Sequence, residues 1–211
     1  ARVRALARAK GVAADEITVC ILERPRHEKL IAEVRSTGAA IRLITDGDVA
    51  GVIHCAESEV TGIDMYMGSG GAPEGVLAAS ALKCMGGQIY GQLIFRNDDE
   101  KARALKAGIT DLNRIYTRDE MVTADVIFAA TGVTDGSLLT GVKHRQRKDG
   151  GEVQTTHSVV MRASSVAKGS ALQMLSVRSG RKALNALQTG AAWPRCPRPW
   201  ALIATSSLGI P

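Results

Sequence analysis

Three short polar segments of the sequence carry side chains that could bind a phosphate group or a divalent cation. In the first segment, "ERPRH" at 23–27, Arg24 and Arg26 flank Pro25. Guanidinium groups form paired hydrogen bonds with phosphate or carboxylate oxygens, and the free N–H groups at a helix start bind the same anions. These residues therefore indicate an anion site, although a solvated helix start has the same composition.

The second segment, "TDGDV", places two carboxylates around a glycine. Asp46, Gly47 and Asp48 could hold a divalent ion, accept hydrogen bonds from sugar hydroxyl groups, or start a helix. Asp48 directly precedes an apolar run with helical spacing, so we expect it to be the N-cap residue of that helix. Asp46 has no such structural role, which makes it the stronger candidate for binding a ligand.

The third segment, "MGSGGAPEG" at 67–75, packs glycines around one carboxylate. Gly71 and its neighbours let a ligand approach the backbone, Pro73 fits the first turn of a helix, and Glu74 lies in that turn. The alternative is a sharp turn whose acid compensates the helix dipole. His27, at the end of the first segment, could belong to the site or face the core.

The elements around these segments form three strand–helix units. Each apolar run is followed by a helical pattern: strands are expected at 17–22, 40–45 and 63–67, and helices at 25–36, 48–57 and 73–85. Short connections of this kind predict an α/β fold, a layered and mostly parallel sheet with helices on its faces. Because the carboxyl ends of parallel strands meet at one edge, the three polar segments should meet there too. Together they fit a phosphorylated polyol and a hard cation such as Mg²⁺ or Mn²⁺.

The rest of the chain continues in a mixed pattern and then changes character. Strands are expected at 88–95, 124–133 and 152–163, the last one antiparallel, a helix at 98–108, and a capping box at Thr117 and Glu120. From 164 to 211 the sequence has no acid and contains both tryptophans. We therefore divide the chain into an α/β part at 1–163 and an atypical basic tail at 164–211, which a shifted reading frame or a diverged terminus would produce.

The composition excludes several classes of protein. The net charge of +6 comes from six basic residues in the tail, while residues 1–162 are neutral, and no basic face carries interleaved aromatic residues. A nucleic-acid partner is therefore not expected. No apolar run approaches the ~18 residues of a membrane span and no signal peptide is evident, so we expect no membrane association and a cytoplasmic location. The four separated cysteines are expected to be buried free thiols.

Three longer stretches give the sequence a family resemblance. "ILERPRHEKLIAEVRSTGAAIRLITDGDVA", "GSGGAPEGVLAASALKCMGGQIYGQL" and "VIFAATGVTDGSLLTGV" resemble the C-terminal half of class II fructose-1,6-bisphosphatases, including bifunctional fructose/sedoheptulose bisphosphatases. The resemblance implies a sugar-phosphatase-type α/β fold and metal-dependent hydrolysis of the 1-phosphate of fructose 1,6-bisphosphate, in gluconeogenesis. It implies Mn²⁺ or Mg²⁺ as cofactor and a homo-oligomer for the complete protein, and it leaves open whether sedoheptulose 1,7-bisphosphate is a further substrate.

The resemblance also implies individual roles. Glu74 corresponds to a metal ligand and Gly71 to a backbone contact with the substrate. Two segments correspond to substrate-binding residues, namely Arg24, Pro25 and Arg26, and Asp46, Gly47 and Asp48. No residue is assigned as catalytic.

Two features depart from the family pattern. The chain opens at Ala1 without the family's N-terminal half, which supplies the other acidic metal ligands, and the tail from 164 matches nothing expected. We therefore expect a fragment that is inactive by itself, since one carboxylate cannot hold Mg²⁺. The alternatives are a non-catalytic sugar-phosphate-binding remnant and one half of a split enzyme. A nucleotide-binding module is disfavoured because the first strand is followed by "RPRH" rather than GxGxxG.

Overall fold

The computed structural model describes residues 1–163, 173–180 and 202–205. The helices are α1 (Arg2–Lys10), α2 (Glu28–Arg35), α3 (Asp48–His54), α4 (Ser58–Thr61), α5 (Ala72–Met85), α6 (Asp98–Lys106) and α7 (Arg118–Met121), with 3₁₀ turns at Ala14–Glu16, Pro25–His27 and Cys55–Glu57. The strands are β1 (Thr18–Leu22), β2 (Ala40–Ile44), β3 (Met65–Tyr66), β4 (Tyr90–Gln92), β5 (Ile115–Thr117), β6 (Ile127–Thr131), β7 (Lys143–Gln146), β8 (Glu152–Arg162), β9 (Gln173–Gly180) and β10 (Leu202–Thr205).

A parallel sheet lies at the centre of the N-terminal part, as the strand–helix units predict. β1 lies between β2 and β3 and pairs with both in parallel, with Cys20 opposite Arg42 on one side and Tyr66 on the other. β1 is the most deeply buried of these strands because both of its faces are covered. The α/β fold class expected from the sequence is confirmed.

One face of this sheet packs against α1 and α2. The alternating residues Val19 and Ile21 of β1 point toward these helices and are fully buried. They form an apolar cluster with residues spaced one helical turn apart on the two helices: Val3, Ala7, Ile31 and Val34. Burying a side chain such as Ile21 contributes about 1.5–3 kcal/mol, so this cluster fixes β1 relative to α2.

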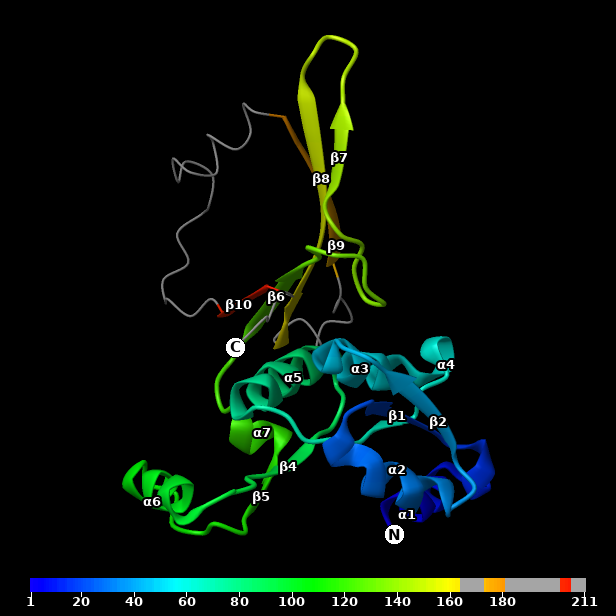
Figure 1. The fold of residues 1–211 in the computed structure, drawn as a ribbon, viewed down its shortest axis with the longest axis vertical. Coiled ribbons are helices and arrows are strands. Elements are labelled where there is room, and N and C mark those ends of the chain that lie inside the picture. The colour runs from blue at the N-terminus through cyan, green and yellow to red at the C-terminus, as the bar shows by residue number, and fades with distance from the viewer. Residues whose placement is uncertain (164–172, 181–201, 206–211) are drawn as a thin grey trace.

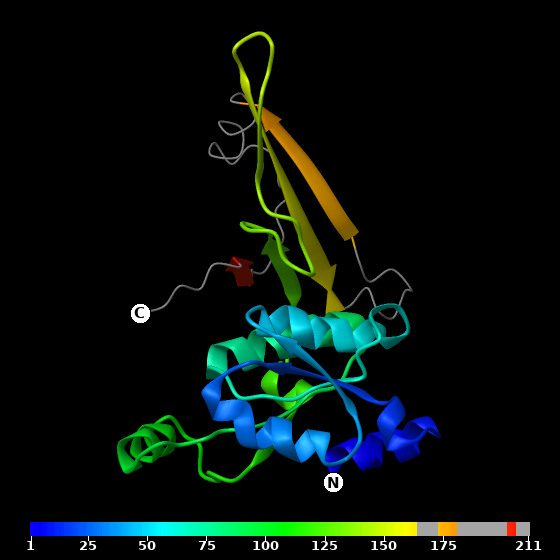
Figure 2. The ribbon, with the colours of Figure 1, turned by 45° about the vertical axis from the view of Figure 1, so that its right-hand side comes forward.

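Helices α3 and α5 form a layer between this sheet and a second, mainly antiparallel one (Figures 1 and 2). On one side, Val52 of α3 packs with Ala78 and Leu82 of α5. On the other side, the two helices contact the second sheet through a cluster of Ile53, Ala81, Cys84, Phe128, Leu139, Val159 and Met161. Small residues along α5 let it lie buried between the two sheets.

The second sheet is built around the long strand β8. β8 pairs antiparallel with β6, β7 and β9, and β10 pairs parallel with β6. Its pairing with β7 continues away from the helical body, as the upper part of Figure 1 shows. The expected antiparallel strand at 152–163 is confirmed. β9 and β10 belong to the segment that the sequence sets apart as a tail, and the boundary at 163/164 stays a prediction.

Several boundaries differ from the sequence expectation. The helix expected at 48–57 ends at His54 and continues as the 3₁₀ turn Cys55–Glu57. The strand expected at 88–95 is shorter, since only Tyr90–Gln92 pairs with β5, and the large side chains of Tyr90 and Ile94 stay exposed. Exposed strands with a single partner are short because little apolar surface is buried to stabilise them.

The cysteine expectation is confirmed for Cys20 and Cys84, which are buried free thiols. Cys55 is only partly buried, and burial raises the pKa of its thiol to about 12. Cys196 lies outside the described residues. None of the described helices is long and apolar enough to cross a membrane.

Candidate active site

The three polar segments meet at the carboxyl end of the parallel sheet, as their positions after β1, β2 and β3 predict. Backbone hydrogen bonds extend the strand pairing into these loops: Glu23 N donates to Ile44 O at 2.8 Å and Met67 N donates to Cys20 O at 3.0 Å. The segments that follow β1 and β3 are therefore adjacent, and the DGD segment after β2 joins them through Asp48.

Arg26 and His27 hold the glycine segment by its single serine. The Nε and Nη2 groups of Arg26 donate to Ser69 O at 3.0 and 2.8 Å. Ser69 N donates to Nε2 of His27 at 2.9 Å, and Nδ1 of His27 lies 2.6 Å from Leu22 O at the end of β1. His27 is 2% exposed, so the open question of its position is answered: it lies in the interior and connects two loops of the site.

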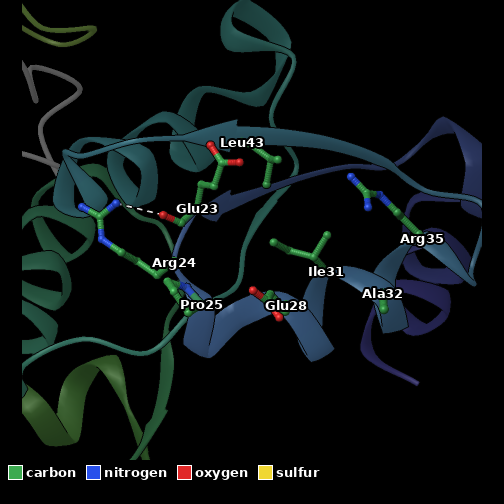
Figure 3. Close-up of a pocket in the computed structure, with 8 residues that line it drawn as sticks. All are labelled: Glu23, Arg24, Pro25, Glu28, Ile31, Ala32, Arg35 and Leu43. Atoms are coloured by element: carbon green, nitrogen blue, oxygen red, sulfur yellow. Dashed lines mark hydrogen bonds between the residues drawn. The ribbon is translucent and has the colours of Figure 1, made fainter.

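Arg24 and Pro25 line a separate pocket. Nη1 of Arg24 donates to the carbonyl of Glu23 at 2.8 Å, which folds the side chain back on its own backbone (Figure 3). Both residues line a pocket of about 360 Å³ between β2 and α2, whose apolar wall includes Ile31 and Leu43. Arg26 does not line this pocket and donates to Ser69 instead, so the two arginine side chains do not form one anion site in this structure.

The DGD segment differs from the sequence expectation in one respect. The N-cap residue of α3 is Gly47, with φ of +74°, and Asp48 is the first residue of the helix, so the expectation that Asp48 caps it was wrong. A left-handed N-cap favours glycine over aspartate, which explains the shift by one residue. Oδ1 of Asp48 accepts from the next N–H, that of Val49, at 3.0 Å. Asp46 is exposed and makes no hydrogen bond or ion pair with the described residues.

Glu74 lies at the start of α5 and turns back toward the glycine segment. Its Oε2 accepts from the N–H of Gly71, the N-cap residue, at 2.7 Å. A Cβ atom added to Gly70 would lie 2.7 Å from Oε2 of Glu74 and 3.2 Å from Oδ2 of Asp48. Glu74 and Asp48 therefore border the same space, and that space exists because residue 70 has no side chain.

The charges around this space influence one another. Burial raises the pKa of Asp48, the neighbouring Glu74 carboxylate raises it further, and Arg26 partly opposes the shift. Burial is the main cause that raises the pKa of the Tyr66 hydroxyl, and the nearby Asp48 carboxylate raises it further. Two neighbouring carboxylates that repel each other provide oxygen ligands of the kind that hard divalent cations prefer.

The donor set is nevertheless incomplete for a magnesium or manganese site. Within residues 1–163, where side chains are described, no three Asp, Glu, His or Cys side chains come together as a metal-binding group. Mg²⁺ takes six oxygens in near-octahedral geometry, several of them from water or a bound phosphate. Glu74 and Asp48 can supply part of such a shell, and further acidic ligands would have to come from another segment.

Replacing Asp48 with asparagine should stabilise the chain when no divalent cation is present. A folded-state pKa above the unfolded value means that stability is lost as pH rises through the folded pKa, so the ionised carboxylate is unfavourable at neutral pH. Asparagine removes the charge and keeps an acceptor for Val49 N. We expect a rise in Tm of about 2 °C at pH 7.5 in a metal-free thermal melt.

At pH 3, where Asp48 is protonated in both states, this difference should disappear. Asp46→Asn, which removes the same charge from an exposed position of the same loop, is the control. An equal rise in both variants would show that general charge reduction, rather than the burial of Asp48 and its repulsion by Glu74, is responsible.

Sequence reasoning missed two residues of the site. Ser69 is held through its backbone N–H and carbonyl, and Tyr66, at the end of β3, lies beside Gly68 and couples electrostatically to Asp48. Tyr66 could have been found as the last polar side chain of its strand. Ser69 offered only the weaker signal of one hydroxyl residue among glycines.

The layered arrangement of helices and sheets is consistent with an α/β fold of the phosphatase type. The family model described as "Bacterial fructose-1,6-bisphosphatase, glpX-encoded" matches residues 1–170. The chain therefore belongs to the bacterial, glpX-encoded fructose-1,6-bisphosphatase family, and the resemblance seen in the sequence is confirmed.

Curated relatives share the name D-fructose 1,6-bisphosphatase class 2/sedoheptulose 1,7-bisphosphatase. The chain is 43% identical over 142 residues to the protein of Microcystis aeruginosa and 42% identical over 142 residues to that of Crocosphaera subtropica. It is 42% identical over 144 residues to that of Synechococcus elongatus. Each match covers 61–62% of this chain and 41% of the relative. The chain thus spans about two fifths of the length of these relatives.

Proposed function

We propose that this chain forms the sugar-phosphate-binding half of a metal-dependent phosphatase that hydrolyses the 1-phosphate of fructose 1,6-bisphosphate, giving fructose 6-phosphate and phosphate. The observation that carries the proposal is the pair of carboxylates, Asp48 and Glu74, that border the space above Gly70 at a sheet edge with Arg26 beside it. The names of the relatives support the substrate, and they add sedoheptulose 1,7-bisphosphate as a second one.

The residues of the chain have distinct tasks in this proposal. Glu74 is the ligand of Mn²⁺ or Mg²⁺, with Asp48 beside it, and Gly71 lets the substrate approach the backbone at the start of α5. Bound there, the cation would lower the pKa of a water molecule and neutralise phosphate charge. In the reaction a water oxygen bonds to phosphorus and the bond from phosphorus to the C1 oxygen breaks. The proton that the water loses is taken up by the C1 oxygen, which leaves as the C1 hydroxyl group of fructose 6-phosphate.

Binding of the sugar phosphate falls to the two remaining segments. Arg26 uses Nε and Nη2 for Ser69, which leaves Nη1 for a phosphate oxygen. Asp46, Gly47 and Asp48 provide acceptors for sugar hydroxyl groups. Arg24 with Pro25 would join the site if its side chain turned away from the Glu23 carbonyl. We place the complete enzyme in the cytoplasm, in gluconeogenesis, as a homo-oligomer.

A second candidate is a sugar-phosphate-binding module without catalysis, either a remnant or one half of a split enzyme. It is favoured by the incomplete donor set in the part of the chain whose side chains are described. In a remnant, sugar-phosphate binding would persist without hydrolysis. In a split enzyme, turnover would require pairing with a separate chain that carries the missing acids.

The chain alone is expected to release no phosphate from fructose 1,6-bisphosphate in the presence of Mn²⁺. Once it is mixed with the N-terminal part of the Synechococcus elongatus relative, we expect phosphate release. The reason is that a competent metal shell needs ligands from both parts. Phosphate release is measured with and without Mn²⁺, and the isolated N-terminal part is the control. Turnover by the chain alone would contradict the half-site proposal, and a folded mixture without turnover would favour the non-catalytic module.

A further inference from the structure

We propose that His27 is a positioning residue that fixes the glycine segment 68–71, and that it does so only in the tautomer with its proton on Nδ1. His27 does not correspond to any of the residues assigned above to substrate or metal. Its effect on ligand binding rests on the proposed function, whereas the tether to Ser69 is a property of the free chain.

The hydrogen-bond partners alone determine the tautomer. Nδ1 lies 2.6 Å from the carbonyl oxygen of Leu22, which can only accept a hydrogen bond, so Nδ1 must carry the proton. Nε2 lies 2.9 Å from the backbone N of Ser69, which can only donate, so Nε2 must be the acceptor. The ring is 2% exposed, and each of its nitrogens has a protein partner.

Ser69 is held from several directions by the segment after β1. Its N–H donates to His27, its Oγ lies 3.1 Å from the same ring nitrogen, and its carbonyl accepts twice from Arg26. The glycines around it have no side chains with which to pack, and glycine loses more conformational entropy on ordering than any other residue. The hydrogen bonds to Ser69 are therefore what ties this segment to the sheet.

Through these hydrogen bonds, the position of β1 determines the position of the candidate metal ligand, Glu74. Leu22 is the last residue of β1, His27 joins it to Ser69, and the N–H of Gly71, two residues further, holds Oε2 of Glu74 at 2.7 Å. Arg26 alone would still hold the carbonyl of Ser69, but from an exposed side chain. Loss of the buried contact should therefore loosen the segment and the placement of Glu74 without removing any proposed ligand.

The first test is the protonation of the ring in the unaltered 211-residue chain. Long-range ¹H–¹⁵N correlation spectra distinguish a protonated from an unprotonated ring nitrogen. We expect His27 to show a protonated Nδ1 and an unprotonated Nε2. A proton on Nε2, or a mixture of the two forms, would overturn the proposal, and this result does not depend on the folding of any variant.

The second test uses two substitutions that each keep one contact. The amide of glutamine reaches the position of Nε2, so His27→Gln keeps an acceptor for Ser69 N, whereas the shorter His27→Asn reaches only toward Leu22. Amide exchange of Ser69 should become at least tenfold faster in the asparagine variant and change less than threefold in the glutamine variant. Equal exchange in both would refute the tether. His144→Gln, on the exposed strand β7, is the matched control.

The effect on the site is measured in the mixture with the N-terminal part of the relative. In His27→Asn, the Mn²⁺ concentration for half-maximal phosphate release should rise about tenfold, and His27→Gln should restore it to within threefold. If amide exchange follows the expectation but the mixture with the unaltered chain binds neither Mn²⁺ nor fructose 1,6-bisphosphate, the hydrogen bond from Ser69 to His27 is supported and the proposed function fails. If Mn²⁺ dependence is the same in both variants despite altered exchange, His27 has no positioning role.

Discussion

Glu74→Gln should lower Mn²⁺-dependent phosphate release about 100-fold or more when the chain is mixed with the N-terminal part of the relative. Residues that only orient a metal ligand typically contribute 10–100-fold, so a ligand itself should lie at or above this range. The amide oxygen of glutamine can still accept the N–H of Gly71, which Glu74 holds at 2.7 Å. The substitution therefore removes the charge while the start of α5 stays capped, and the loss should be partly recovered at high Mn²⁺ concentration.

The chain offers a closely matched control for this substitution. Glu120 also lies in the first turn of a helix and accepts the N–H of the N-cap residue, Thr117, at 2.8 Å. Glu120→Gln should leave the Mn²⁺ dependence unchanged, since this helix, α7, begins on β5 rather than at the parallel sheet edge. If both substitutions reduced activity equally, helix capping and not metal binding would explain the importance of Glu74.

The parallel sheet could be predicted because its signals are local. The apolar runs around Val19 and Ile41 are short, end in polar loops and are followed by helical spacing, so both the strands and their order as strand–helix units follow from the sequence. The capping box of Thr117 and Glu120 was found for the same reason, since its members are three residues apart.

The details of the site could not be predicted, because they depend on contacts between residues distant in sequence. His27 and Ser69 are 42 residues apart, and nothing in the local pattern indicates that one holds the other. Asp48 followed a reliable rule for N-caps, but Gly47 can adopt the left-handed conformation and takes that position. The raised pKa of Asp48 likewise depends first on burial and then on the nearby Glu74 carboxylate, and only the folded chain provides either.

Gly70→Ala should raise the Mn²⁺ concentration required for half-maximal activity about 10–100-fold while leaving the chain folded. The new methyl group would meet Oε2 of Glu74 at 2.7 Å and Oδ2 of Asp48 at 3.2 Å, so it would occupy the space that the two carboxylates border. Glu74 is long and can move aside, which spares the fold, but it would then give up its hydrogen bond to Gly71. The measurement is Mn²⁺-dependent phosphate release together with a thermal melt.

Gly75→Ala separates the loss of this space from a general effect of replacing a glycine with alanine near the start of α5. Gly75 lies in the first turns of α5, and a Cβ atom added there meets nothing within 4 Å. Alanine should stabilise this helix by about 0.5–1 kcal/mol and leave the Mn²⁺ dependence unchanged. If Gly70→Ala behaved like Gly75→Ala, the space above Gly70 would not be where the cation binds, and Glu74 would have to reach a metal in another orientation.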